Sequence, residues 1–423
     1  MIDWASEQSI AGRAGQARFD RLAITSVFGD PLDLRTWSGA PARLAMALRR
    51  RGIGVVGIHS GGTRGEHILL GAQQSAMGFG VPAATEAILR GRMARQGAAA
   101  RIASIIRQQG VRHVLHMGTL DLPAIDGASD VKHYVYCDHA WALSLRHRPD
   151  IDSYSPRAVR WFDELEREAL SGLAHVFTFG RYVRDHLIEH YGLAPERVTA
   201  VGCGMGPIHP YYGGKDYAGG KLLFVAKHLF QAKGGELVLE AVEIARRTRP
   251  DLTLTIVGNP RVRRQIPRDP AITFHGHLPF EDLQGLYRDA ALLVQPMLND
   301  PWGQVYVEAM ISRTPVLGLV RNGLPEIIEH GRHGFMVDRA EPRALAAAII
   351  DAVGDPDRLA RMGDSGLRHV LASYSWDRVA ERIAFPPAQP ANDDLAGRLA
   401  VPDPLPVAMP LSGAGPRQPT QAP

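Results

Sequence analysis

Cysteine is scarce in this sequence, and long apolar runs are missing. Only Cys137 and Cys203 occur among its 423 residues, and they lie far apart. Neither a disulfide framework nor a metal-binding cysteine cluster is therefore expected. No apolar stretch approaches the roughly 20 residues that a membrane-spanning helix needs, and charges interrupt the first twenty residues, which argues against a secretory signal. These absences favour a cytoplasmic protein.

Charge of one sign is not in large excess either, since 48 Lys and Arg residues face 44 Asp and Glu residues. The small basic surplus lies early, on two predicted helices. It comprises Arg43, Arg49, Arg50, Arg51, Arg90, Arg92, Arg95, Arg101 and Arg107. Such helices either rest on anionic lipid headgroups, which would place the protein at the inner face of the membrane, or form ordinary solvated faces. We expect no nucleic-acid partner.

What the sequence has in abundance is an alternation of short, β-branched apolar runs with helical patterns. This alternation is typical of doubly wound α/β folds with parallel sheets. The first set of predicted strands covers 22–28, 53–59, 111–117, 132–137, 175–179 and 197–201. A second set begins at 221–226 and continues through LTLTIVG, AITFHG, ALLVQP and TPVLGLV. Two Rossmann-like sheets are expected.

Composition suggests where these sheets begin and end. Residues 202–220 are rich in Gly, Pro and Tyr without an apolar period, as in an interdomain linker. The last 38 residues are proline-rich and too polar to order themselves. We predict an extension over 1–20, an acceptor-binding Rossmann-like domain over 21–205, a linker over 206–220, a nucleotide-sugar-binding Rossmann-like domain over 221–373, a terminal helix over 374–385 that packs back toward the first domain, and a disordered tail over 386–423.

Two lysines follow the first strand of the second set. Lys227 comes directly after it, and Lys233 precedes two glycines that open the next helix. Ligands of parallel sheets bind beyond the carboxyl ends of strands. Two cations beside a helix N-terminus there are suited to a diphosphate. The alternative is a pair of ordinary surface lysines.

A carboxylate pair follows the strand at ALLVQP. Asp300 precedes Gly303, and a short helix carries Glu308 eight residues after Asp300. Glycine lets backbone N–H groups approach a ligand, and a nearby carboxylate can accept hydrogen bonds from vicinal hydroxyls. Taken alone, this spacing is common on surface helices. In the first half, Gly39 lies between the first strand and the helix at 40–51, where it can face the same ligand.

In combination, these segments resemble a known family. The order LLFVAKHLFQAKGGELVLEAV, LTLTIVGN, ITFHGHLPFEDLQGLYRDAALLVQP and DPWGQVYVEAMISRTPVLGLVRNGLPEIIEHGRHGFMV resembles the nucleotide-sugar domain of family 4 retaining glycosyltransferases, also called glycosyl transferases group 1. The resemblance spans 197–385 and is looser over 20–195. It implies the GT-B fold, in which two Rossmann-like doubly wound domains face each other across a cleft.

The resemblance also implies roles for the charged residues. Lys227 falls where the family usually has Arg, and Lys233 falls on its Lys, so the pair is expected to hold the donor diphosphate. Glu308 matches the second Glu of the family's E-x7-E motif, which binds ribose. Asp300 stands where the first Glu contacts the donor sugar. Because Asp is one methylene shorter, that contact is expected to be shifted, water-mediated or absent.

Five further positions match the family's site. Gly303, Gln304 and Val305 correspond to the backbone loop near the sugar and phosphates. Gly39 corresponds to the glycine loop of the amino-terminal domain. His139 corresponds to the active-site histidine near the donor sugar, although a structural histidine is the alternative, because the sequence holds 17 of them.

The implied activity is a hexosyl transfer from a nucleotide-diphosphate sugar to an acceptor. We expect no cofactor and no metal, because the lysines and helix-terminal N–H groups would stabilise the leaving diphosphate. The acceptor class is a glycan or a lipid-linked, polysaccharide or cell-envelope precursor, and the nucleotide stays open among UDP, GDP and ADP. The alternative is a weakly active or non-catalytic nucleotide-sugar-binding subunit. A nicotinamide-dependent enzyme is disfavoured, because the glycine run at 202–206 does not open a helix.

Overall fold

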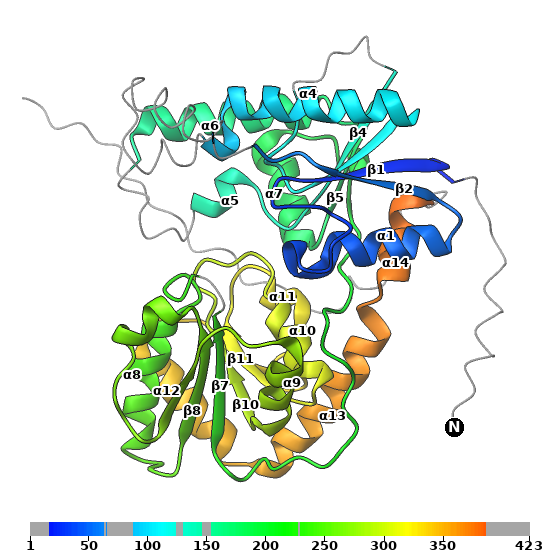
Figure 1. Ribbon diagram of the computed structural model, residues 1–423. Helices are drawn as coiled ribbons and strands as arrows, with labels where there is room; N and C mark the ends of the chain where they lie inside the picture. Colours follow the sequence, from blue (N-terminus) through cyan, green and yellow to red (C-terminus); the bar gives the residue numbers. More distant parts are fainter. Residues whose placement is uncertain are drawn as a thin grey trace, which may run out of the picture. The chain divides into compact units, whose positions relative to one another are not determined.

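The computed structural model describes residues 17–62, 65, 88–123, 130–145, 154–226 and 229–385 of the chain. Within these ranges the chain forms two six-stranded parallel sheets with helices around them (Figure 1). The predicted doubly wound α/β class is confirmed. Lys227, the segment 1–16 and the segment 386–423, which is the expected disordered tail, lie outside the described residues.

The first sheet contains the early strands in the order β2-β1-β3-β4-β5-β6, all parallel. The strands are β1 (Arg21–Ser26), β2 (Gly54–His59), β3 (His113–Met117), β4 (Lys132–Cys137), β5 (His175–Thr178) and β6 (Val198–Ala200). The helices are α1 (Ala40–Arg50), α4 (Arg92–Gln109), α5 (Trp141–Leu145), α6 (Pro156–Ser171) and α7 (Arg181–Tyr191). The chain order reverses between β1 and β3.

The second sheet has the order β12-β11-β10-β7-β8-β9, and its chain order reverses between β7 and β10. The strands are β7 (Lys221–Ala226), β8 (Thr253–Gly258), β9 (Ile272–His275), β10 (Leu292–Val294), β11 (Val316–Leu319) and β12 (Gly334–Val337). The helices are α8 (Gly235–Arg246), α9 (Phe280–Asp289), α10 (Gln304–Ile311), α11 (Leu324–Ile327), α12 (Pro342–Val353) and α13 (Pro356–Ser373), and α14 (Trp376–Ala384) follows them.

The central strand β7 shows why the sequence has continuous apolar runs. Leu222 and Phe224 belong to one buried cluster together with Val238 of α8. Leu223, which points to the other face, belongs to the cluster that contains Tyr287 of α9. A strand covered by helices on both faces needs apolar side chains at every position rather than at alternate positions.

The segment predicted as a linker has no helix or strand over 201–220, yet it is held firmly against the second sheet. The Tyr211 amide donates to the Ile311 carbonyl at 3.0 Å. The Lys215 ammonium donates to the Tyr287 carbonyl at 2.7 Å and to the Thr314 hydroxyl at 2.7 Å. Burial lowers the pKa of Lys215 to about 7. This segment is therefore fixed to the ends of α9 and α10 rather than free.

Helix α14 packs against α1, at the other end of the sequence. Asp377 pairs with Arg50 at 3.0 Å and with Arg51 at 2.8 Å. Behind these ion pairs, Ile383 and Leu48 are both fully buried in one apolar cluster. The domain bounds that we predict remain a prediction, but the last described helix clearly shares a core with the first long one.

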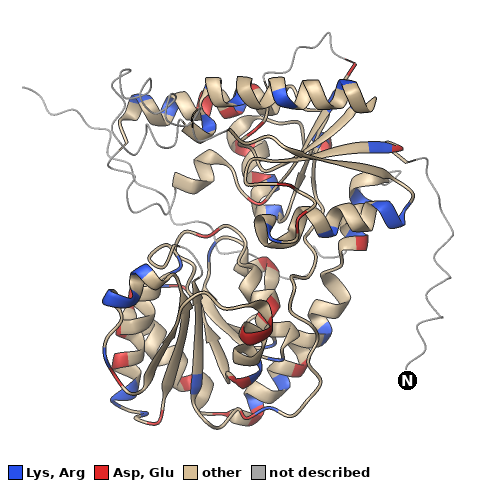
Figure 2. Cartoon of the chain, in the orientation of Figure 1, with Lys and Arg blue, Asp and Glu red and all other residues tan. Residues whose placement is uncertain are grey.

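The early arginines are not uniformly exposed, and the prediction of two basic helix faces is wrong in part. Arg95 is 6% exposed and donates to the carbonyl of Arg90. Arg101 donates to the Ser60 carbonyl at 2.8 Å. Figure 2 shows acidic and basic residues interspersed along the helices around both sheets. No helix in the described ranges is both long enough and apolar enough to cross a bilayer.

Candidate functional site

The predicted site residues of the second sheet meet where β7 and β10 end. These neighbouring strands mark the reversal of chain order, which is the usual ligand position in doubly wound sheets. The segment after β7 is hydrogen-bonded to the loop after β10. The Met297 backbone amide donates to the Lys233 carbonyl at 3.0 Å, and the Asn299 backbone amide donates to the Ala232 carbonyl at 2.7 Å. Gly234, at φ +87°, lets the two segments approach each other.

Lys233 and Asp300 form an ion pair in this position. The Lys233 ammonium lies 3.0 Å from a carboxylate oxygen of Asp300, and the two side chains are 15% and 20% exposed. Asn322 holds the loop by donating its side-chain amide to the Asp300 carbonyl at 2.9 Å. The residues predicted for the diphosphate and for the sugar are thus in contact. An anionic ligand that reaches Lys233 must compete with Asp300 for the ammonium.

Glu308 is a nearly buried carboxylate on α10, with 5% of its surface exposed. One of its oxygens accepts a hydrogen bond of 2.9 Å from the hydroxyl of Tyr287, which is fully buried on α9. Its other oxygen faces the backbone of Gly206, because a Cβ atom on that glycine would lie 3.0 Å from it. The predicted ribose-binding carboxylate is thus held by the Tyr287 hydroxyl of α9 and lies against the main chain of Gly206.

The residues that begin α10 are fixed by close packing. Gly303 has φ +81°, and a Cβ atom there would lie 2.6 Å from the ring of Tyr306. The side-chain amide of Gln304 donates to the Gly204 carbonyl at 3.2 Å. Val305 is partly buried. The predicted backbone loop is therefore tied to the segment before residue 206, which brings it beside Glu308.

The predicted glycine loop of the first sheet leads directly into α1. Residues 37–39 have positive φ values of 46°, 55° and 79°. A side chain on Gly39 would meet the Leu34 carbonyl at 2.8 Å and the Arg43 guanidinium at 2.9 Å. Burial lowers the pKa of Arg43, and the charge of Glu308 acts in the opposite direction. The Glu308 carboxylate therefore interacts electrostatically with Arg43, whose guanidinium lies against this loop.

His139 follows β4 and is partly buried. Its neighbour Asp138, which we did not single out from the sequence, is coupled to the Asp300 loop. The Tyr182 hydroxyl donates to the Asp138 carbonyl at 3.1 Å and also to the carbonyl of Pro301. Burial, and to a lesser extent the charge of Asp300, raise the pKa of Asp138 to about 7. The end of β4 thus adds a carboxyl group that is partly protonated at neutral pH.

Glu326 on α11 is a further residue that the sequence analysis missed. Its carboxylate accepts hydrogen bonds from the backbone amides of Arg181 at 2.8 Å and Tyr182 at 2.6 Å. It therefore caps α7, which no side chain of its own caps. Its only signal in the sequence was its position shortly after a predicted strand.

No described residues form a group of three or more His, Cys, Asp or Glu side chains that could hold a metal ion. The Asp-x-Asp sequence at 355–357 is a helix start, because Asp355 accepts a hydrogen bond of 2.8 Å from the Arg358 amide. The similar sequence at 150–152 lies outside the described ranges. Metal independence remains a prediction.

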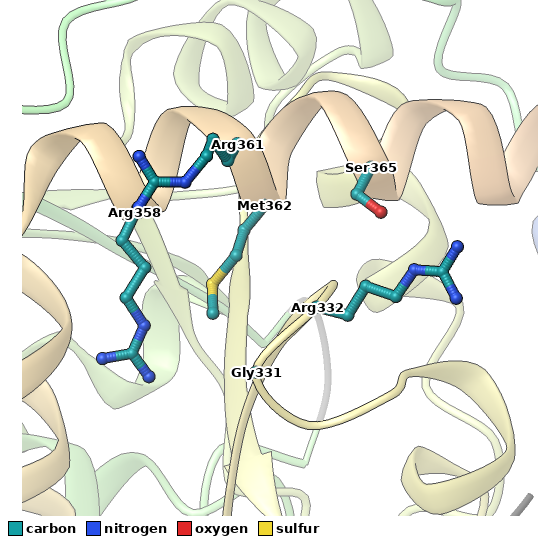
Figure 3. A pocket seen from close by; sticks show the side chains of 6 residues that line it. All are labelled: Gly331, Arg332, Arg358, Arg361, Met362 and Ser365. Carbon is teal, nitrogen blue, oxygen red and sulfur yellow. The ribbon is translucent and has the colours of Figure 1, made fainter.

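A surface hollow of about 460 Å³ lies elsewhere on the second sheet (Figure 3). It is lined by Gly331, Arg332, Arg358, Arg361, Met362 and Ser365. Gly331 and Arg332 precede β12, so the hollow lies at the amino end of a strand, opposite the edge where Lys233 and Asp300 meet. Arg332 pairs with Glu329 at 3.0 Å and Arg358 with Asp351 at 3.1 Å. The hollow is not part of the candidate site.

The second sheet is similar in sequence to known proteins. Residues 219–355 match the family described as Glycosyl transferases group 1. A D-inositol 3-phosphate glycosyltransferase of Corynebacterium kroppenstedtii is 29% identical over 228 residues, which cover 48% of this chain and 50% of that protein. The chain thus spans about half the length of the curated relatives it matches.

Solved structures resemble a larger part of the chain. The sucrose-phosphate synthase of Thermosynechococcus elongatus has a TM-score of 0.66 at 16% identity, and the match covers 86% of this chain and 97% of that one. Anabaena HepE, solved in complex with UDP and glucose, has a TM-score of 0.58 at 15% identity, with 86% and 98% covered. These likenesses show that the fold is GT-B-like.

Proposed function

We propose that the chain transfers a sugar from a nucleotide-diphosphate sugar to an acceptor, because residues 219–355 match the family described as Glycosyl transferases group 1. The observation that carries the proposal is the meeting of Lys233, Asp300 and the start of α10 at the ends of β7 and β10. Each of these three elements suits one part of such a donor.

Lys233 is assigned to the diphosphate. When the bond between the sugar and the phosphate breaks, negative charge develops on the leaving diphosphate, and a fixed ammonium group stabilises it. Lys227 is assigned to the same group, although its position lies outside the described residues. As the diphosphate takes over Lys233, the Asp300 carboxylate loses its partner and becomes able to accept hydrogen bonds from sugar hydroxyls.

Glu308 is assigned to the ribose. The Tyr287 hydroxyl fixes one carboxylate oxygen at 2.9 Å, and this sets the direction of the other oxygen toward Gly206. A carboxylate held in this way accepts hydrogen bonds from the two vicinal ribose hydroxyls. We propose further that the acceptor, a glycan or lipid-linked precursor, docks beside Gly39 and His139. The reaction retains the anomeric configuration and needs no metal in this proposal, and we assign no nucleophile.

A thermal-shift screen tests the donor assignment. Purified protein is heated with UDP, GDP, ADP and their sugars, with and without EDTA. UDP comes first, because it is the nucleotide in the HepE structure. A ligand at 100 times its Kd stabilises the folded state by about 2.7 kcal/mol. We expect one nucleotide to raise Tm equally with and without EDTA.

Two lysine variants make the screen specific. Lys233→Ala should abolish the nucleotide shift. Lys221→Ala is the matched control, because Lys221 is an exposed lysine at the start of the same β7 strand. A shift that survives in Lys233→Ala would refute the diphosphate assignment, and a shift that needs a divalent metal would refute metal independence.

A second candidate is a nucleotide-sugar-binding subunit without transferase activity. The ion pair between Lys233 and Asp300 favours it, because a shorter acid here is already engaged by the diphosphate-binding lysine. Donor hydrolysis or transfer by the purified protein, lost in Glu308→Ala, would support the enzyme. Nucleotide binding without any turnover would support the subunit.

We also propose a cytoplasmic location, supported by two buried cysteines that form no disulfide. Contact with the inner face of a membrane would have to use other basic residues, since Arg50, Arg51, Arg95 and Arg101 are engaged within the protein. Flotation with anionic vesicles tests it, and protein that stays at the bottom of the gradient would refute it.

A further inference from the structure

Arg43 is a partly buried arginine that the proposed mechanism does not use. Among the described residues, no carboxylate lies within ion-pairing distance of its guanidinium. The later arginines of this stretch are engaged, since Arg50 and Arg51 pair with Asp377 and Arg49 donates to the Val55 carbonyl. Burial of a cation that forms no ion pair is unfavourable. A cation left in this condition beside a predicted site suggests an anionic ligand.

The position of Arg43 fits one end of a nucleotide. Its guanidinium lies against the glycine loop, 2.9 Å from the point where a Cβ atom of Gly39 would be. On the other side, Glu308 is close enough to influence the charge of Arg43 but does not form an ion pair with it. The bare backbone of Gly206 borders the same carboxylate. A cation beside one glycine and a carboxylate beside another are therefore within electrostatic reach of each other.

A ribose phosphate matches this arrangement. Its vicinal hydroxyls suit a carboxylate, and its phosphate, at the other end of the same sugar, suits a cation. A guanidinium binds phosphate through two parallel hydrogen bonds, whereas lysine offers a single point charge. Both residues predicted for the diphosphate, Lys227 and Lys233, are lysines, so Arg43 would add a planar fork to these two point charges.

We propose that Arg43 binds a phosphate of the donor nucleoside diphosphate from α1, while Glu308 binds the ribose of the same nucleotide. This inference rests on the proposed function. It adds a phosphate-binding residue from α1, which packs beside the first sheet. The other charged residues of the site follow strands of the second sheet. A phosphate group on the acceptor has the same chemistry, and the experiment below separates the two sources.

The test is calorimetric titration of the full chain with UDP, UMP and uridine. The variants are Arg43→Ala and Arg43→Lys, with Arg49→Ala as the control, because Arg49 is an exposed arginine on the same helix. We expect Arg43→Ala to weaken UDP binding at least tenfold and to leave uridine binding unchanged, because a charge-assisted hydrogen bond is lost. Arg43→Lys should recover part of the UDP affinity, and Arg49→Ala should match the wild type.

Melting curves without nucleotide show whether the variants fold. If Arg43→Ala does not fold, Arg43→Lys takes its place in the test, because it keeps the charge and most of the side chain. UDP affinity that falls in Lys233→Ala but not in Arg43→Ala would overturn the role of Arg43 and leave the proposed function intact. Unchanged UDP affinity together with lost binding of inorganic phosphate would assign the phosphate to an acceptor and overturn the donor assignment. A wild-type protein that binds none of UDP, GDP and ADP would overturn both proposals.

Discussion

The hydrogen bond between Tyr287 and Glu308 offers a direct test of how the candidate site is held. Tyr287→Phe removes only a hydroxyl from a fully buried side chain, so the packing of α9 stays the same. The lost hydrogen bond of 2.9 Å ends on a carboxylate that is 5% exposed. A hydrogen bond to a charged group contributes about 1.5–3 kcal/mol to stability. Burial, followed by the charge of Glu308, keeps the pKa of Tyr287 well above its usual value, so the hydroxyl remains a donor at neutral pH.

The measurement is urea unfolding of the protein without nucleotide. We expect Tyr287→Phe to lower the free energy of unfolding by about 1.5–3 kcal/mol with an unchanged m-value. The double variant Tyr287→Phe/Glu308→Gln should lose less than the sum of the two single variants, because Glu308→Gln removes the charge that strengthens the hydrogen bond that Tyr287→Phe removes. If the enzyme is active, the donor KM should rise more than kcat falls, because the carboxylate is less well oriented for ribose.

Tyr306→Phe is the matched control for this experiment. Tyr306 is another buried tyrosine, and its hydroxyl donates to the neutral Gln295 carbonyl at 2.7 Å. It should cost about 0.5–1.5 kcal/mol and show no coupling to Glu308→Gln. A Tyr287→Phe variant that loses less than about 0.5 kcal/mol, or one whose effect adds fully to that of Glu308→Gln, would refute the reasoning.

Three other substitutions test separate contacts. Gly39→Ala should lower the free energy of unfolding by at least about 1–2 kcal/mol, because a left-handed residue with a Cβ atom is strained and the Leu34 carbonyl lies 2.8 Å away; an unchanged urea midpoint would contradict this. Asp138→Asn tests the raised pKa of about 7. The neutral acid is favoured in the folded state, so the wild type has its full stability below the ordinary aspartate pKa and loses it as pH rises through 7. The Tm of the wild type relative to Asp138→Asn should therefore fall between pH 5 and pH 8, and parallel curves would rule the shift out. Glu326→Ala should cost about 0.5–2 kcal/mol, because α7 loses its cap; urea unfolding checks it, with Glu326→Gln expected to recover part of the loss, and equal stabilities of all three proteins would show that the cap contributes nothing.

The strands and the family site could be predicted because their signals are local. The apolar run at 221–226 and the lysine after it lie next to each other in the chain, and the strand-end rule then places Lys233 near Asp300. The ion pair between them confirms that proximity. The predicted roles of these residues, and of Gly39 and His139, remain predictions. Lys227 stays one too, since it lies outside the described ranges.

The residues that sequence reasoning missed are defined by distant partners. Arg43 is one arginine in a basic run, and helical periodicity alone does not tell which member turns toward Glu308. In the sequence Tyr287 looks like an ordinary apolar position of α9. Its hydroxyl finds its partner Glu308 only because α10 packs beside α9. Asp138 follows a strand like many aspartates, and its raised pKa depends on burial and on the Asp300 loop. Such contacts require the arrangement of whole elements.

The packing of α14 against α1 has a consequence for the synthesis of the chain. The ribosome releases α1 long before it reaches Trp376. The apolar face around Leu48 therefore lacks its partner Ile383 while more than three hundred further residues are synthesised. The first sheet therefore completes its core only after the second sheet has been made. During that interval the apolar face of α1 is open to other chains, and a product that stops before residue 376 is expected to aggregate although both sheets are present.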